Sequence, residues 1–232
     1  MHTALGGLAL YHEWDWKAAE AHLLRALELN PNYAEAHHFL GLVRVLLGRR
    51  DQGFESQQMA ISLNPLGNNF LYTQTNWFID AGRVEEAVAA FRKADQVEPP
   101  VPYGLMMVSS FLFEEGRTEE AFRALRKWGA VMGYPDLNRL PLIFEARKDS
   151  ALTAEALALL EDVRSLLGLR AGDLVWVYLH LHDPGKVLRI VREAIAERHV
   201  IVPFLGMRHS RCRISELPEV RAALVEVGVP YL

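Results

Sequence analysis

The sequence predicts an all-α protein, a solenoid built from repeated pairs of antiparallel helices. Two features recur every 34 residues, a proline and a glycine-arginine dipeptide. The prolines are Pro31, Pro65 and Pro99, and the dipeptides are Gly48-Arg49, Gly82-Arg83 and Gly116-Arg117. Apolar residues at helical spacing precede the prolines, so the repeating unit is two helices joined by a glycine-containing turn and ended by a proline.

The period divides the first part of the chain into four units and predicts at least eight helices there. The units span residues 1–32, 33–66, 67–100 and 101–134. The first helix is expected to run to Tyr11 and to enter a turn at residues 12–15. Because one unit cannot bury its own apolar face, the units must stack, and the stack presents a curved surface. A start inside a first helix also suggests a piece excised from a longer protein.

Small residues recur where two helices of such a stack would cross closely. We expect this position for Gly7, Ala19, Gly41, Gly53, Ala60 and Ala87. Trp128 stands where the preceding units carry Ala26, Ala60 and Ala94. A bulky indole at a tight crossing predicts that the stack changes after the fourth unit.

From Pro135 onward the 34-residue pattern blurs, but helical spacing continues. We expect helices over 137–148, 154–167, 171–181 and 186–198, with Asp183 as the N-cap of the last one. Residues 135–232 are interpreted as degenerate helical repeats and a C-terminal capping helix, continuous with the solenoid. Residues 200–204 are expected to be an extended connector, because Pro203 interrupts them and a lone strand has no partner.

Composition excludes several classes of protein. Half of the residues are apolar and 23% are charged, which is ordinary for a soluble folded protein. The net charge of -4 argues against a general nucleic-acid binder. No apolar run is long enough to span a bilayer, and the single Cys212 cannot form an internal disulfide. We therefore predict a cytoplasmic protein that binds neither nucleic acid nor membrane directly.

The units resemble the tetratricopeptide repeat (TPR), whose pattern is W-x2-L-G-x2-Y, then A-x3-F, then P. The second unit reads His37-x2-Leu40-Gly41-x2-Arg44, then Gly53-x3-Gln57, Ala60 and Pro65, and the third has Ala87-x3-Phe91, Ala94 and Pro99. The small residues follow the pattern better than the aromatic ones. Over roughly residues 1–134, the resemblance implies a right-handed superhelical solenoid whose first helices line a concave groove.

A narrower resemblance concerns the TPR regions of bacterial signalling proteins and transcriptional regulators. Those regions follow winged-helix DNA-binding, nucleotide-cyclase or kinase domains. Residues 13–20, 25–31, 36–37 and 64–66 are similar to them, and residues 217–231 resemble their usual ending, with Leu217 and Glu219 replacing an aspartate and an arginine. No effector domain is present in this sequence.

Nine histidines raise the question of a metal site, and their spacing argues against one. His180 and His182 are two residues apart, which places them on different faces of a helix. His37 and His38 are adjacent, so they also lie on different faces. The sequence has no quartet of His, Cys or carboxylate residues with zinc spacing. We expect no metal, no other cofactor, and histidines that pack or lie at the surface.

Catalytic motifs are also missing. Cys212 follows His209 among the arginines of residues 208–213, but an exposed basic loop explains this cluster more simply than an activated thiol. The carboxylate pairs Glu85-Glu86 and Glu119-Glu120 recur at the starts of second helices, where they complement the helix dipole. Since no phosphate-binding glycine loop occurs either, the protein is predicted not to be an enzyme.

The TPR resemblance implies groove-lining positions on the first helices. They carry Ala4, Leu5, Leu8 and Tyr11, then His38, Phe39, Leu42 and Val45, then Tyr72, Thr73, Asn76 and Ile79, then Tyr103, Met106, Met107 and Ser110. This lining suits an extended peptide or an amphipathic helix. Several of these residues, such as Leu42, Val45 and Ile79, could instead pack against the next helix. The lysines and asparagines with which some TPR modules clamp a carboxylate are absent from the corresponding positions. Because the predicted lining also has no Lys or Arg, binding should depend little on salt.

We therefore predict a non-enzymatic protein-protein interaction module that binds a peptide or protein segment in a concave groove. It would be the regulatory part of a bacterial signalling or transcription factor, with its partner unidentified and a homodimer left open. The alternative is a small-molecule sensing domain whose groove is closed by the degenerate C-terminal half. An enclosed cavity with convergent polar groups would favour the sensor, and an open groove would favour the interaction module.

Overall fold

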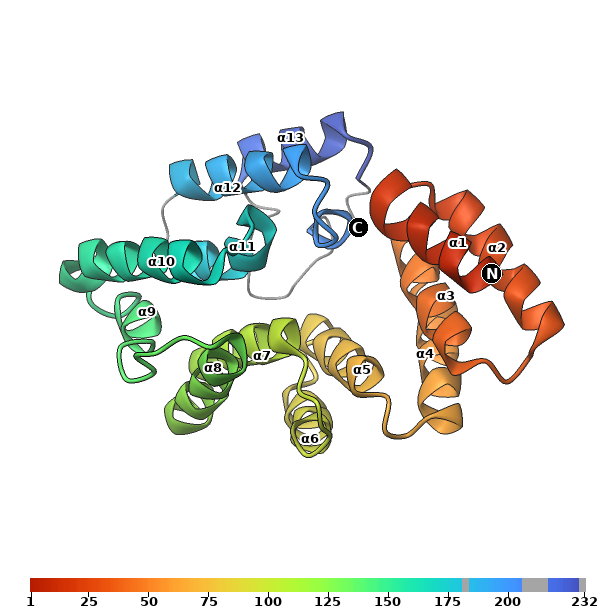
Figure 1. Ribbon diagram of the computed structural model, residues 1–232, viewed down its shortest axis with the longest axis horizontal. Coiled ribbons are helices and arrows are strands. Elements are labelled where there is room, and N and C mark those ends of the chain that lie inside the picture. The colour runs from red at the N-terminus through yellow and green to blue at the C-terminus, as the bar shows by residue number, and fades with distance from the viewer. Residues whose placement is uncertain (181–183, 206–216, 230–232) are drawn as a thin grey trace.

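The computed structural model describes residues 1–180, 184–205 and 217–229, and its first part is a row of antiparallel helix pairs (Figure 1). The first eight helices are α1 (His2–Leu8), α2 (Trp16–Leu29), α3 (Ala34–Leu46), α4 (Arg50–Leu63), α5 (Asn68–Asp80), α6 (Val84–Asp95), α7 (Pro102–Glu114) and α8 (Thr118–Met132). A π-helical turn, Ala9–Glu13, extends α1. Each odd-numbered helix packs against the next even-numbered one. The predicted all-α solenoid is confirmed.

The remaining helices bring the solenoid back toward its own beginning. They are α9 (Leu142–Glu145), α10 (Thr153–Leu167), α11 (Ala171–His180), α12 (Pro184–Ala196) and α13 (Pro218–Glu226), with short 3-10 turns at Ser150–Leu152 and Val202–Phe204. Helix α11 contacts α7, so α11 is the next helix after α7 along the inner row. In the sequence, α9 and α10 come between the α7–α8 pair and α11. Figure 1 shows the array curled into a ring, with the turn after α12 facing the N-terminal helices.

The recurring glycine-arginine dipeptide closes the first helix of each later unit. Gly48, Gly82 and Gly116 have φ values of 80°, 69° and 75°, a left-handed conformation that glycine adopts without steric cost. The amide of the following arginine then donates to the carbonyl five residues back, as in Arg83 to Phe78. This is the Schellman arrangement of helix C-termini, and it explains why the dipeptide repeats.

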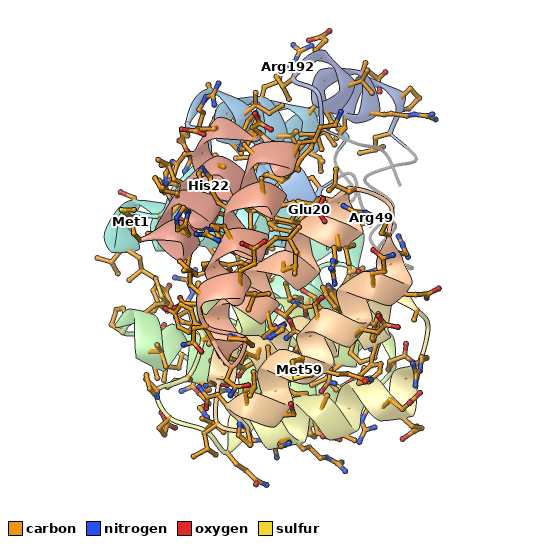
Figure 2. All side chains as sticks on the ribbon, turned by 90° about the vertical axis from the view of Figure 1, so that its right-hand side faces the viewer. Met1, Glu20, His22, Arg49, Met59 and Arg192 are labelled. Atoms are coloured by element: carbon orange, nitrogen blue, oxygen red, sulfur yellow. The ribbon has the colours of Figure 1, made fainter. Side chains whose placement is uncertain are left out.

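Neighbouring units are also joined at the outer surface. Glu20 on α2 and Arg49, which precedes α4, form an ion pair with a distance of 2.6 Å between Oε2 and Nη2. Figure 2 shows both side chains on this outer face. The pair is partly exposed, so its contribution to stability is small.

The closest described crossing within a pair joins α3 and α4 through two glycines. A Cβ on Gly41 would lie 3.0 Å from the carbonyl oxygen of Gly53, and a Cβ on Gly53 would lie 2.6 Å from Val45 Cγ2. In α1 the tight position is Gly6, where a Cβ would lie 2.7 Å from Leu23 Cγ, whereas the predicted Gly7 makes an ordinary contact. The 34-residue period therefore predicted Gly7 at this crossing, whereas the residue at the crossing is Gly6.

Two predicted segments are wrong. The helix expected over 137–148 is reduced to α9, since Pro141 lacks an amide proton and residues 137–141 form turns before it. The expected connector contains a 3-10 turn, because Pro203 is placed in its first positions and Val202 and Pro203 are buried. The predicted N-cap Asp183 and the basic cluster around Cys212 lie outside the described residues.

The core has two parts. The smaller cluster joins α1 to α4 and includes Trp77, while the larger one runs from α5 to the C-terminal helices. Phe204 packs against both clusters, so the turn after α12 contacts the beginning of the solenoid as well as its end. None of the helices in the described ranges has the length and apolar character that crossing a membrane requires.

Candidate ligand-binding cavity

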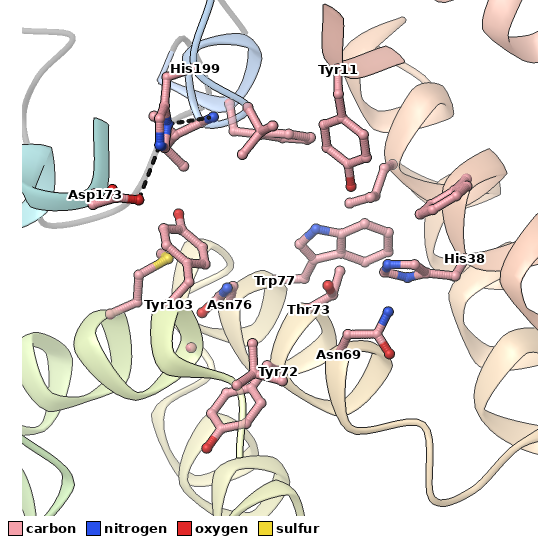
Figure 3. A pocket seen from close by; sticks show the side chains of 18 of the residues that line it. Tyr11, His38, Asn69, Tyr72, Thr73, Asn76, Trp77, Tyr103, Asp173 and His199 are labelled. Carbon is pink, nitrogen blue, oxygen red and sulfur yellow. Dashed lines mark hydrogen bonds and ion pairs between the residues drawn. The ribbon is translucent and has the colours of Figure 1, made fainter. Parts of the chain in front are cut away.

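The inner face of the ring holds a partly open cavity of about 300 Å³. Its walls are the inner helices α3, α5 and α7, the start of α11, and residues 199–204, which close it on the far side (Figure 3). The first helices of the units thus line the concave surface, and the C-terminal half adds a second wall, so that the site is a partly enclosed pocket.

A polar stripe on α5 forms one wall. Asn69, Thr73, Asn76 and Asp80 recur at helical spacing and all line the cavity, while Phe70, Leu71 and Thr75 on the same helix are buried in the core. The Oδ1 atom of Asn76 is buried and has no hydrogen-bond partner among the described residues. Figure 3 shows its amide group facing the cavity. A buried acceptor without a partner is costly, so the Asn76 side chain has unmet hydrogen-bonding capacity in this wall.

Aromatic rings supply much of the apolar surface. Tyr11 packs edge-on against Phe39, with 5.9 Å between ring centroids, and lies 6.3 Å from the ring of Phe204. Burial, with a smaller contribution from Glu35, raises the pKa of Tyr11 to about 12. Its hydroxyl, which points toward Trp77 in Figure 3, is therefore a neutral hydrogen-bonding group.

His38 is held in one neutral form. Its Nδ1 lies 2.9 Å from Gln57 Oε1, and the amide nitrogen of Gln57 donates to the carbonyl oxygen of Phe70 at 2.6 Å. Since Gln57 Oε1 can only accept, Nδ1 of His38 carries the proton and donates. Burial lowers the pKa of His38 to about 4, against a smaller opposing effect of the Gln57 hydrogen bond. The histidine therefore adds a neutral imidazole to the wall.

A buried histidine and an aspartate form the opposite wall. His199 Nε2 lies 3.1 Å from Asp173 Oδ1, and the amide of Ile201 donates to Nδ1 of the same ring at 3.3 Å. The amide of Arg170 donates to Asp173 Oδ2 at 2.8 Å. Burial opposes ionisation of Asp173, but the hydrogen bonds from His199 and Arg170 outweigh it and lower the pKa of the carboxyl. With both ring nitrogens occupied, His199 is not a free base; it attaches the turn after α12 to α11.

Gly172 makes this attachment sterically feasible. A Cβ at that position would lie 2.1 Å from His199 Nδ1. Gly172→Ala is therefore expected to displace the ring from Asp173 and to lower the free energy of unfolding by about 2 kcal/mol in urea denaturation. The matched control is Gly7→Ala, where the added methyl group would meet Phe39 at an ordinary 3.4 Å. Equal stability of the two variants would contradict this role of Gly172.

Most of the predicted groove residues line the cavity, and some do not. His38, Phe39, Leu42, Tyr72, Thr73, Asn76, Tyr103, Met107 and Tyr11 line it. Ala4, Leu5, Leu8, Val45, Ile79, Met106 and Ser110 do not. Met106 and Ser110 are buried in α7 on a face turned away from the cavity, since adjacent helical residues differ by about 100° in direction. Leu5 and Leu8 are exposed.

Tyr72 differs from the other lining residues. Its ring lies against Gly104, where a Cβ would be only 2.2 Å away, and Figure 3 shows its hydroxyl pointing away from the cavity. Tyr72 therefore forms the floor of the site. The expectation of a lining without Lys or Arg is also wrong, since the C-terminal half contributes Arg170 beside Asp173.

Sequence reasoning missed the contribution of the C-terminal half. Asp173 carries a readable local signal, because a carboxylate at the third helical position often accepts from the N-cap amide, as it does here with Arg170. The pairing with His199, 26 residues later, has no local signal. In the described residues, no three His, Cys, Asp or Glu side chains gather into a group that could hold a metal ion.

Fold and site together define a TPR-like helical repeat protein with a central cavity. The chain is similar in structure to PilW, described as a widely conserved type IV pilus biogenesis factor, with a TM-score of 0.56, 19% identity and 96% of each chain covered. The P58(IPK) TPR domain aligns with 97% of this chain and 96% of its own, at a TM-score of 0.40 and 12% identity. No protein-family model matches the sequence, and no curated protein matches it. The similarity to PilW supports the fold.

Proposed function

We propose that this protein is a non-enzymatic binding module that holds an extended segment of a protein partner in its central cavity. The observation that carries the proposal is the polar stripe of α5 facing aromatic residues across the cavity. Neutral hydrogen-bonding groups on an apolar wall complement a peptide backbone, whose amide and carbonyl groups both need partners when buried.

The dimensions of the stripe agree with such a ligand. From Asn69 to Asp80 the helix rises by about 16 Å, which matches about five residues of extended chain. Asp80, Asp173 and Arg170 add charges near the ends of the site. Salt should therefore weaken binding somewhat, more than a lining without charges would allow.

The imidazole groups of the cavity argue against catalysis. His38 is buried, and its pKa, lowered to about 4, makes its free ring nitrogen a weak base, while His199 uses both ring nitrogens within the protein. A general base needs a nitrogen that is both free and sufficiently basic near the working pH. By its resemblance over residues 13–20, 25–31, 36–37, 64–66 and 217–231, the module would be the regulatory part of a bacterial signalling or transcription factor in the cytoplasm.

The second wall that residues 170–173 and 199–204 add to the cavity favours a second candidate, a small-molecule sensing domain. A volume of about 300 Å³ is at the lower end of the range for sites that enclose small ligands. Such a ligand would use the same wall of α5. The two candidates differ in whether the occupant extends beyond the cavity.

Asn76→Ala is expected to weaken a bound peptide about tenfold, which corresponds to about 1.4 kcal/mol, because the variant loses a buried hydrogen bond. Extended peptides selected from a random library on the immobilised protein supply the ligand, and calorimetry measures the affinity. The control is Asn32→Ala, an exposed asparagine outside the cavity. The sensor would be favoured instead if no peptide were selected and a small metabolite bound the parent protein but bound Asn76→Ala more weakly.

A further inference from the structure

Two left-handed residues of the described chain are bulky, whereas the others are glycines. Gly48, Gly82, Gly116, Gly133, Gly168 and Gly228 all have positive φ values, as glycine readily does. The exceptions are Trp14, with φ of 58°, and Arg198, with φ of 45°. A side chain in this region costs free energy, so a reason for its presence is required.

Both exceptions stand at helix ends where glycine is the usual residue. Trp14 follows the π-helical turn after α1, and the next amide, of Asp15, donates to the carbonyl of Ala9. Arg198 follows α12, and the next amide, of His199, donates to the carbonyl of Ala194. The end at Arg198 is a Schellman end, and the end at Trp14 is the corresponding arrangement after a π-helical turn, with a bond that spans six residues instead of five. In both, the left-handed position favours glycine. Local structure alone would therefore select glycine at both positions.

The two side chains contact each other where the two ends of the solenoid meet. The guanidinium carbon of Arg198 lies 5.0 Å from the centre of the Trp14 ring, a cation-π geometry. Arg198 Nη1 also donates to the carbonyl oxygen of His12, 186 residues away in the chain. Tyr11 and Phe204, which line the cavity, approach each other beside this contact. The contact thus lies at the seam where the end of the solenoid reaches its beginning.

We propose that Trp14 and Arg198 form a clasp that closes the ring around the cavity, and that the ring opens at this seam to admit its ligand. The stacking and the hydrogen bond favour the closed ring. The left-handed backbone of both residues belongs to the two helix ends, so its cost is present whether the seam is closed or open. The clasp consists of one stacking contact and one hydrogen bond made by an exposed arginine, so its contribution to closure is modest and the open state stays within reach. The admission of a ligand rests on the proposed function, whereas the clasp itself does not.

A distance measurement across the seam tests the clasp in the full chain. Spin labels are attached to cysteines at Ala21 and Arg192, which are exposed on α2 and α12, with Cys212 changed to serine. Electron-electron double resonance should give one narrow distance distribution for the parent. The double variant Trp14→Gly/Arg198→Gly should give a longer and broader one, with unchanged helix content by circular dichroism. An unchanged distribution in the double variant would overturn the proposal.

Glycine is the informative substitution, because it removes the contact and at the same time relieves the backbone. If the two residues served only their own helix ends, the glycine variant would be as closed as the parent and at least as stable. The matched control is Lys148→Ala, which removes a cation-π contact with Phe113 away from the seam. Lys148→Ala should give the same spin-label distance distribution as the parent. If it changed the distribution as much as the glycine variant does, the effect of the glycine variant could not be attributed to the Trp14–Arg198 contact.

Ligand entry is tested separately. Cysteines at Trp14 and Arg198, joined by a short bis-maleimide, should slow association of the peptide selected for the parent at least tenfold. Equal association rates before and after cross-linking would show that the seam is not the entrance. If no peptide binds the parent, the proposed function fails, while the distance measurement still decides whether the clasp exists.

Discussion

Replacing Gly41 with leucine is expected to lower the free energy of unfolding by about 3 kcal/mol. Already the first side-chain carbon would lie 3.0 Å from the carbonyl oxygen of Gly53 and 3.3 Å from Trp77 Cη2. The opposing atoms are backbone and a buried indole, which cannot move aside without separating α3 from α4. Overpacking of a close crossing is therefore unavoidable, and the midpoint of urea unfolding should fall.

Ala21→Leu is the control for Gly41→Leu. Ala21 is exposed on α2, so the same side chain there should leave the midpoint nearly unchanged. If Gly41→Leu unfolded at the same urea concentration as the parent, the α3-α4 crossing would not be as close as described.

Acidification from pH 7 to pH 4 is expected to remove about 3 kcal/mol of stability through His38 alone. Burial lowers the pKa of His38 from 6.5 to about 4, so between these values the unfolded chain binds a proton that the folded chain does not. This contribution to stability is complete above pH 6.5 and is lost as the pH falls toward 4. The pKa of the Asp173 carboxyl is also lowered, so this group adds a further loss of stability as the pH falls below the ordinary pKa range of a carboxyl.

The measurement is the free energy of unfolding in urea at several pH values. His38→Gln should flatten the dependence between pH 6.5 and 4, because a glutamine amide can still donate to Gln57 but does not titrate. His37→Gln is the neighbouring control; His37 bonds the carbonyl of Pro31 at the surface, and its variant should keep the parent slope. A parent slope in His38→Gln would mean that another group causes the acid sensitivity.

The fold could be predicted because its signals are local and repeated. Gly48, Gly82 and Gly116 each need a left-handed backbone at the same place in a unit, so one physical requirement appears three times in the sequence. The site could be predicted in part for the same reason. Asn76 and Phe39 occupy first-helix positions that face the concave side of a stack. Met106 and Ser110 were assigned to the groove from the family pattern, but both are buried in α7 and do not line the cavity.

The sequence by itself determined the helix pairs, their turns and most of the inner surface, because these depend on residues within one or two units. Only the tertiary structure decided that the inner surface is one side of a partly enclosed cavity with His199, Asp173 and Arg170 in its opposite wall. Closure depends on the small rotation between successive units, which accumulates along the solenoid until its end meets its beginning. No local pattern encodes that sum, and so the contact of Trp14 with Arg198 could be recognised only in the folded ring.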